Sequence, residues 1–246
     1  MERKKWSKKR GILYAILWTV FVLGIAVFWY LNDGYEALPQ VADLALTSDE
    51  MVTVEQIEGA VVFMPKEAEA GLIFYPGGKV DHEAYALLMN VLANEGMVCI
   101  LLEVPFDLAV FDMNAAEDYR YLYPEIEDWY VGGHSLGGAM AASYLEKYVE
   151  EYKGLILCAS YSTVDYSETD LKVISMYGSN DEVLNIEKYE ECKKNLPEDF
   201  AELVIEGGNH AFFGTYGLQE GDGTATIENG SQIGIAAEFI MESVRE

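Results

Sequence analysis

The sequence Gly-His-Ser-Leu-Gly at residues 133–137 places a serine, a residue type that can act as a catalytic nucleophile, between two glycines. Glycines at both positions are typical of a sharp turn between a strand and a helix, because side chains there would clash with the closely passing elements. The flanking sequence fits such a turn, since an apolar run over Trp129–Gly132 precedes the motif and a run rich in glycine and alanine follows it. We therefore predict that Ser135 is a nucleophile.

A serine hydroxyl reacts weakly unless a base removes its proton, and the chain has three histidines. His134 adjoins the serine, and on a sharp turn its side chain should point away from the hydroxyl and be buried with a hydrogen-bond partner. His82 opens a predicted helix and is expected to be a cap or a surface residue. His210 follows the last predicted strand on a glycine-rich loop, where a parallel sheet presents its reactive groups. We predict that His210 is the base.

The base needs a carboxylate that orients its ring and stabilises its protonated form. Asp181 follows an apolar run directly, in the sequence Gly-Ser-Asn-Asp, and precedes the predicted base along the chain. The resulting order Ser135, Asp181, His210 differs from the orders in chymotrypsin-like and subtilisin-like enzymes. We predict that Asp181 is the acid, with Glu182 and Asp165 as the alternatives.

Attack on a carbonyl creates an oxyanion, which needs preorganised N–H donors. The backbone amide of Leu136 would supply one, at the start of the helix that follows the serine. The loop Pro-Gly-Gly-Lys-Val at residues 76–80 would supply the other, because glycines let the backbone approach a substrate closely. Within this loop we select the amide of Gly78 for this role, with Lys79 as the alternative.

These residues lie between alternating strand and helix patterns, and most strand candidates are continuous apolar runs typical of strands covered on both faces. The predicted strands are Met51–Gln56, Ala60–Phe63, Gly71–Tyr75, Met97–Glu103, Trp129–Gly132, Gly154–Ala159, Lys172–Tyr177 and Ala201–Glu206. The predicted helices are His82–Glu95, Leu136–Glu151, Ile186–Asn195 and Gln232–Val244, with a shorter one over Ala115–Leu122. The first two strands flank Glu58-Gly59 as an antiparallel hairpin, and the rest indicate a doubly wound, mostly parallel sheet with helices on both faces.

Several segments together resemble the small α/β-hydrolases of the dienelactone-hydrolase-like "alpha/beta hydrolase fold-5" group. They are the segment Phe-Tyr-Pro-Gly-Gly-Lys-Val-Asp-His at 74–82, Gly-His-Ser-Leu-Gly-Gly at 133–138, Tyr-Gly-Ser-Asn-Asp at 177–181 and Gly-Gly-Asn-His-Ala-Phe-Phe-Gly at 207–214. The resemblance covers roughly Val52 to the C-terminus. It implies an α/β-hydrolase fold and a Ser-Asp-His triad at Ser135, Asp181 and His210, and it assigns no substrate.

The surroundings of the predicted site are expected to be open. Only 12 residues, Ser160–Leu171, separate two predicted strands where many lipases and epoxide hydrolases place a lid, so we predict no lid domain. Phe106, which follows a strand, would line the pocket or pack in the core. The glycine-rich segment Phe212–Gly230 would shape the pocket or form a surface loop, and the sequence leaves both alternatives open.

The segment Gly11–Leu31 contains 21 residues without a charge, which is long enough as a helix to span the hydrocarbon core of a bilayer. Six Lys and Arg residues precede it, and the positive-inside rule then places the N-terminus in the cytoplasm and the rest outside the cell membrane. A cleaved signal peptide is the alternative, but its apolar region would run only about 7–15 residues and end at a small-x-small site. We predict an uncleaved single-pass anchor.

The predicted organisation is a basic cytoplasmic tail (1–10), a transmembrane signal anchor (11–31), a linker (32–50) and a catalytic domain (51–246). Residues 11–246 contain ten Lys and Arg residues and 41 Asp and Glu residues. Such an acidic surface excludes nucleic acid as a partner. The cysteine spacing matches neither a disulfide framework nor a metal site. We expect no metal and no cofactor.

The sequence therefore predicts a membrane-anchored serine hydrolase that cleaves a carboxylic ester or a related acyl bond through an acyl-enzyme. Its partners would be a small-molecule or surface-presented acyl substrate and, through residues 11–31, the lipid bilayer. Two alternatives remain: an acyltransferase or peptidase using the same triad, and a catalytically silent binding domain at the cell surface.

Overall fold

The structure is a computed structural model that describes residues 8–31 and 33–246. It divides into two compact units, Met1–Gly34 and Tyr35–Glu246. Most of the predicted basic tail, and residue 32 of the predicted linker, lie outside the described residues.

The first unit contains one helix, α1 (Lys8–Leu31). Its segment Arg10–Trp29 has a mean hydropathy of 2.4 and is long and apolar enough to cross a membrane. Large apolar side chains such as Phe21 and Leu23 are exposed along it. The hydroxyl of Thr19, a polar side chain in the uncharged part of the helix, donates to the carbonyl of Ala15, 3.0 Å away. The Thr19 hydroxyl is thus satisfied within the helix, as a lipid environment requires of a polar group.

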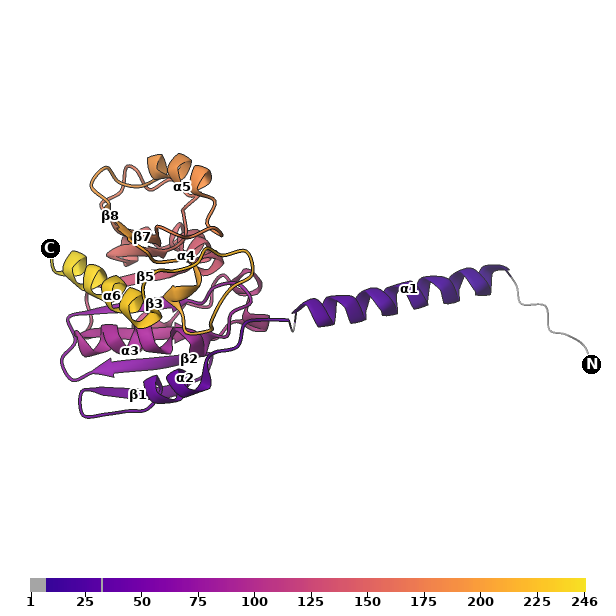
Figure 1. The fold of residues 1–246 in the computed structure, drawn as a ribbon, viewed down its shortest axis with the longest axis horizontal. Coiled ribbons are helices and arrows are strands. Elements are labelled where there is room, and N and C mark those ends of the chain that lie inside the picture. The colour runs from indigo at the N-terminus through magenta and orange to yellow at the C-terminus, as the bar shows by residue number, and fades with distance from the viewer. Residues whose placement is uncertain (1–7, 32) are drawn as a thin grey trace, which may run out of the picture. The chain divides into compact units, whose positions relative to one another are not determined.

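The second unit is built on one sheet of eight strands in the order β1-β2-β4-β3-β5-β6-β7-β8, with β1 at one edge and β8 at the other (Figure 1). The first two strands form the predicted hairpin, β2 pairs antiparallel with β4, and all other pairs are parallel. The strands are β1 (Val52–Ile57), β2 (Ala60–Pro65), β3 (Ala70–Tyr75), β4 (Met97–Leu102), β5 (Trp129–His134), β6 (Gly154–Cys158), β7 (Lys172–Gly178) and β8 (Ala201–Ile205). The predicted doubly wound, mostly parallel sheet is confirmed.

Helices cover both faces of the sheet because successive strand residues point to opposite sides. In β3, Leu72 and Phe74 pack in the cluster that contains α3 (Ala86–Asn94) and α6 (Asn229–Arg245). Ile73 and Tyr75 pack in the cluster that contains α4 (Leu136–Leu145). The remaining helices of this unit are α2 (Pro39–Ala45) and α5 (Ile186–Cys192).

Four predicted helices are shorter in the structure than in the sequence pattern. The one predicted over Ile186–Asn195 is α-helical only to Cys192 and ends as a 3-10 turn. The helix predicted from His82 begins as a 3-10 turn, His82–Tyr85, before α3. The one predicted to Glu151 ends at Leu145, and only a 3-10 turn at Tyr119–Leu122 forms in the segment predicted as a short helix.

The predicted linker over residues 32–50 is wrong from Tyr35 onward, where the chain already belongs to the second unit. The amide of Tyr35 donates to the carbonyl of Lys79 at 2.7 Å. Pro39 starts helix α2, and Ala42 and Ala45 are buried against the cluster around α3. A seven-residue helix offers too few turns for its buried face to be recognised from periodicity.

Placing a charge on the buried face of α2 tests this packing. Ala42→Asp should destabilise the protein by about 3 kcal/mol, because Ala42 is 2% exposed and the carboxylate would lack a partner. The melting temperature of the full chain in detergent should fall by roughly 6–12 °C. The matched control is Leu44→Asp, whose site is 77% exposed and which should change stability by less than about 0.5 kcal/mol. Equal stability of the two variants would contradict the packing of α2.

Candidate active site

Ser135 lies between β5 and α4 with φ 52° and ψ −121°, which is an unfavourable backbone conformation for any residue other than glycine. Its neighbours explain the glycines of the motif. A Cβ on Gly133 would lie 2.6 Å from the backbone carbon of Gly137 and from the Tyr75 carbonyl oxygen. A Cβ on Gly137 would collide with the Tyr75 and Pro76 carbonyl oxygens. The turn thus requires both glycines, as predicted from the motif.

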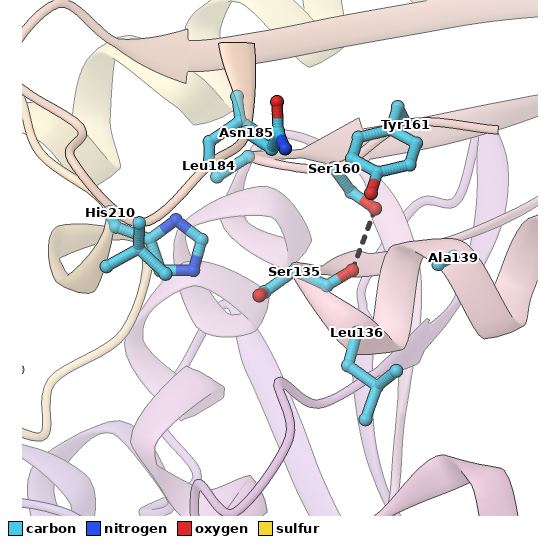
Figure 2. A pocket seen from close by; sticks show the side chains of 10 residues that line it. Ser135, Leu136, Ala139, Ser160, Tyr161, Leu184, Asn185 and His210 are labelled. Carbon is cyan, nitrogen blue, oxygen red and sulfur yellow. Dashed lines mark hydrogen bonds between the residues drawn. The ribbon is translucent and has the colours of Figure 1, made fainter. Parts of the chain in front are cut away.

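Two hydrogen bonds, one to the end of β6 and one to the loop that follows it, hold this turn. The Ser135 amide donates to the Cys158 carbonyl at 2.9 Å, and the Ser160 hydroxyl donates to the Ser135 carbonyl at 2.7 Å. The side-chain oxygen of Ser135 is left to point toward the His210 ring (Figure 2).

His210 lies beside a buried carboxylate. Its Nδ1 is 2.8 Å from Asp181 Oδ2, and both side chains are almost completely buried. Oδ1 of Asp181 accepts from the amides of Val183 and Leu184 at 2.9 and 2.7 Å. A carboxylate held in this way accepts a hydrogen bond from Nδ1–H, which keeps the proton on Nδ1 and leaves Nε2 of His210 as the acceptor.

The two alternative acids do not pair with His210. Asp165 bonds instead to the amide and the hydroxyl of Ser167. The other alternative, Glu182, is exposed. Of the three carboxylates weighed from the sequence, the structure places only Asp181 against His210.

Ser135 and His210 share one cavity of about 300 Å³ (Figure 2). Its wall is mostly apolar, and none of its residues is cationic. The lining residues are Ser135, Leu136, Ala139, Ala159, Ser160, Tyr161, Val183, Leu184, Asn185 and His210.

The two expected oxyanion donors lie next to each other. A Cβ on Gly78 would be 2.9 Å from Cδ2 of Leu136. In residues 33–246, neither the Gly78 nor the Leu136 amide has a protein acceptor. The amide of Lys79, the alternative, donates to the Asp107 carbonyl at 2.7 Å. The geometry therefore favours Gly78 over Lys79.

Of the other two histidines, His134 is buried as expected, whereas His82 is half-buried and is not the cap. His134 is buried, with Nδ1 2.8 Å from the Tyr85 hydroxyl oxygen. Burial, and then the nearby His210, lower the pKa of His134 well below its usual value, so that this ring stays neutral. His82 lies in the 3-10 turn after Asp81, whose carboxylate caps that turn.

Asp222, in the segment Phe212–Gly230, is a structural partner of the site to which the sequence assigned no particular role. Its carboxylate accepts from the amides of His210, Ala211 and Gly223 at 3.3, 2.9 and 2.8 Å. The segment Phe212–Gly230 thus braces the histidine loop, and it contributes no residue to the cavity wall. The sequence around an aspartate in a glycine-rich stretch does not indicate which backbone amides its carboxylate will accept hydrogen bonds from.

Two further expectations concern the rim. Phe106 is 53% exposed and does not line the cavity, so neither of its expected placements is correct. The connection Ser160–Leu171 contains no helix, and no lid domain is inserted between β6 and β7.

Exchange of the buried acid for its amide tests the histidine–carboxylate pair. Asp181→Asn should lower kcat by about 10³–10⁴-fold with a small change in KM, because the amide stabilises the wrong tautomer of His210. Steady-state kinetics on an activated ester measure this. The matched control is Glu182→Gln at the exposed neighbour, which should retain activity within about twofold of wild type. Similar losses in both variants would argue against Asp181 as the orienting acid.

Comparison with known proteins supplies the family. The sequence model described as "Alpha/beta hydrolase family" matches residues 71–234. No curated protein matches the sequence significantly. Among solved structures, Est1E from Butyrivibrio proteoclasticus with bound ferulic acid is 16% identical over 82% of this chain and 99% of its own, with a TM-score of 0.58. A dienelactone hydrolase from Anabaena variabilis is 12% identical over 78% and 99%, also with a TM-score of 0.58. At such identities the likeness shows the fold, and the predicted α/β-hydrolase fold is confirmed.

Proposed function

Because this chain belongs to the alpha/beta hydrolase family and is a hydrolase by that membership, we propose that it cleaves carboxylic esters or related acyl bonds as a serine hydrolase. The proposal rests on the arrangement of three side chains, those of Ser135, His210 and Asp181, at one site. Ser135 lies on a strained turn, its hydroxyl points to His210, and His210 is held by buried Asp181 (Figure 2).

In the first half of the proposed reaction, Oγ of Ser135 attacks the acyl carbon while its proton passes to Nε2 of His210. The carbonyl oxygen becomes an oxyanion that accepts hydrogen bonds from the amides of Gly78 and Leu136. Asp181 stabilises the imidazolium through Nδ1. Collapse of the tetrahedral intermediate breaks the ester bond, and the leaving alcohol takes the proton from His210.

In the second half, water replaces the alcohol. His210 removes a proton from the water as its oxygen attacks the acyl-enzyme, and the same two amides hold the second oxyanion. The Ser135 oxygen leaves with the proton from His210, which restores the enzyme and releases the acid.

We further propose an uncharged acyl group of modest size as the substrate class. The mostly apolar wall of the cavity, its volume of about 300 Å³ and its lack of cationic residues support this. The acidic surface of the domain disfavours anionic substrates. Est1E, a neighbour in fold, was solved with ferulic acid, an aromatic acid, and this supports a comparison of aryl and alkyl acyl groups.

A fluorophosphonate probe tests the nucleophile. The wild-type protein should be labelled at Ser135, and Ser135→Ala should lose all labelling. Ser160, the other serine of the cavity wall, cannot replace it, because its hydroxyl donates to the carbonyl of residue 135. The matched control is Ser143→Ala on helix α4, whose hydroxyl bonds only to the Ala139 carbonyl and which should label normally. A folded wild-type protein that fails to react would overturn the proposal and favour a silent binding domain.

A substrate panel separates the reactions that one triad can perform. Rapid turnover of p-nitrophenyl esters with water as acceptor would support ester hydrolysis. Faster turnover with an added alcohol or amine acceptor would indicate an acyltransferase, and cleavage of peptide amides at comparable rates would indicate a peptidase.

We also propose that α1 anchors the protein in the cell membrane, with the catalytic domain outside the cytoplasm. The full chain should sediment with membranes and require detergent for extraction, whereas a variant that begins at Tyr35 should remain in the aqueous fraction. The intact mass of the membrane form should include residues 11–31. Loss of about the first 30–47 residues would instead identify a cleaved signal peptide.

A further inference from the structure

One buried hydroxyl links the two sides of the candidate active site. Tyr85 is completely buried at the end of the turn that precedes α3. Its oxygen accepts a hydrogen bond from the amide of Gly77 at 3.1 Å and lies 2.8 Å from Nδ1 of His134. Gly77 directly precedes the oxyanion donor Gly78, and His134 directly precedes the nucleophile Ser135.

The direction of the hydrogen bond between Tyr85 and His134 follows from the number of protons that the Tyr85 hydroxyl can donate. A phenol has one proton to donate, and its oxygen already accepts from the Gly77 amide. The Tyr85 proton therefore goes to Nδ1 of His134, which makes His134 a neutral imidazole with its proton on Nε2. His134 Nε2 is buried and has no hydrogen-bond partner among the described residues. If Nδ1 were the donor, both the Tyr85 proton and the Nε2 lone pair would be buried without a partner, whereas this assignment leaves one group, the Nε2 proton, unpaired.

This neutral ring packs against the base. The ring centroids of His134 and His210 are 4.5 Å apart, and Phe213 lies on His134 as well, at 5.6 Å. His210 is thus held by a carboxylate at Nδ1 and by the ring of His134. A neutral neighbour leaves His210 free to become positively charged during the reaction, whereas a charged one so close would oppose it.

The arrangement leaves no room for a side chain at residue 77. A Cβ there would lie 2.5 Å from the Tyr85 hydroxyl oxygen and 2.8 Å from Nδ1 of His134. The first glycine of the Pro-Gly-Gly loop is therefore needed for the contact between Tyr85 and His134, while the second provides the oxyanion donor.

We propose that Tyr85 is a positioning residue of the hydrolytic site, whose hydroxyl holds the oxyanion loop through Gly77 and fixes His134 as the neutral ring that supports His210. The proposal rests on the proposed hydrolase function. It assigns to the histidine of the Gly-His-Ser-Leu-Gly motif a role in supporting the base, and it makes Tyr85 the residue that connects the nucleophile turn to the oxyanion loop.

Removal of the hydroxyl tests the proposal. Tyr85→Phe should lower kcat by about tenfold or more while KM stays within about twofold, because the lost bonds position groups that act in the transition state. Rates are normalised to the concentration of active sites, titrated with the fluorophosphonate, so that misfolded protein does not contribute. The matched control is Tyr189→Phe, which also removes a buried hydroxyl with two partners, Ser175 and Glu202, and should leave kcat within about twofold.

A second variant removes the same hydrogen bond from the other side. His134→Phe keeps a ring against His210 but leaves the Tyr85 proton without its acceptor, and kcat should again fall with little change in KM. Both changes break the same hydrogen bond. The kcat of the double variant should therefore fall by a much smaller factor than the product of the two single-variant factors. If either single variant fails to fold, the kcat of the other decides.

The outcomes separate this inference from the function on which it rests. A wild-type protein without labelling or turnover would overturn the proposed hydrolase. An active wild type, with normalised kcat in Tyr85→Phe or His134→Phe within twofold of it, would overturn the positioning role alone.

Discussion

The backbone of Ser135 takes a positive φ between β5 and α4, and most of the active site depends on what holds it there. Such a conformation persists only where the surrounding structure imposes it. The carbonyls of Tyr75 and Pro76 crowd the motif from the β3 side, and hydrogen bonds to Cys158 and Ser160 hold it from the β6 side. The serine is therefore presented only when β3, β5 and β6 lie side by side, as they do in the sheet.

The parallel strands then bring distant residues together. The proposed oxyanion loop follows β3, the proposed nucleophile follows β5, Asp181 follows β7 and His210 follows β8. Since the carboxyl ends of parallel strands meet at one edge of the sheet, four separate loops converge there. Further contacts must hold the conformation of such loops. Asp222 holds the histidine loop by accepting hydrogen bonds from three backbone amides.

The structure also shows that segments without a recognisable sequence motif contact the loops of the candidate site. The residues from Tyr35 onward are part of the domain, and the Tyr35 amide donates to the carbonyl of Lys79 in the proposed oxyanion loop. Tyr35 also stacks near Tyr216, in the segment that follows His210. The start of the domain thus contacts both the oxyanion loop and the segment that braces the histidine, so its packing and the geometry of the site are connected.

The sequence by itself determined the order of strands and helices, the apolar helix, the glycine-flanked Ser135 and the choice of His210 among three histidines. These features are local: strands buried on both faces appear as continuous apolar runs, and a sharp turn requires glycine where it stands. Only the tertiary structure decided that Asp181, and neither Glu182 nor Asp165, meets His210, and that the amide of Lys79 is already bonded. It alone showed that residues 35–50 pack into the domain and that Tyr85 reaches both Gly77 and His134. These contacts join residues far apart in the chain, and their partners depend on how the strands and loops are placed in space, which no local pattern of residues records.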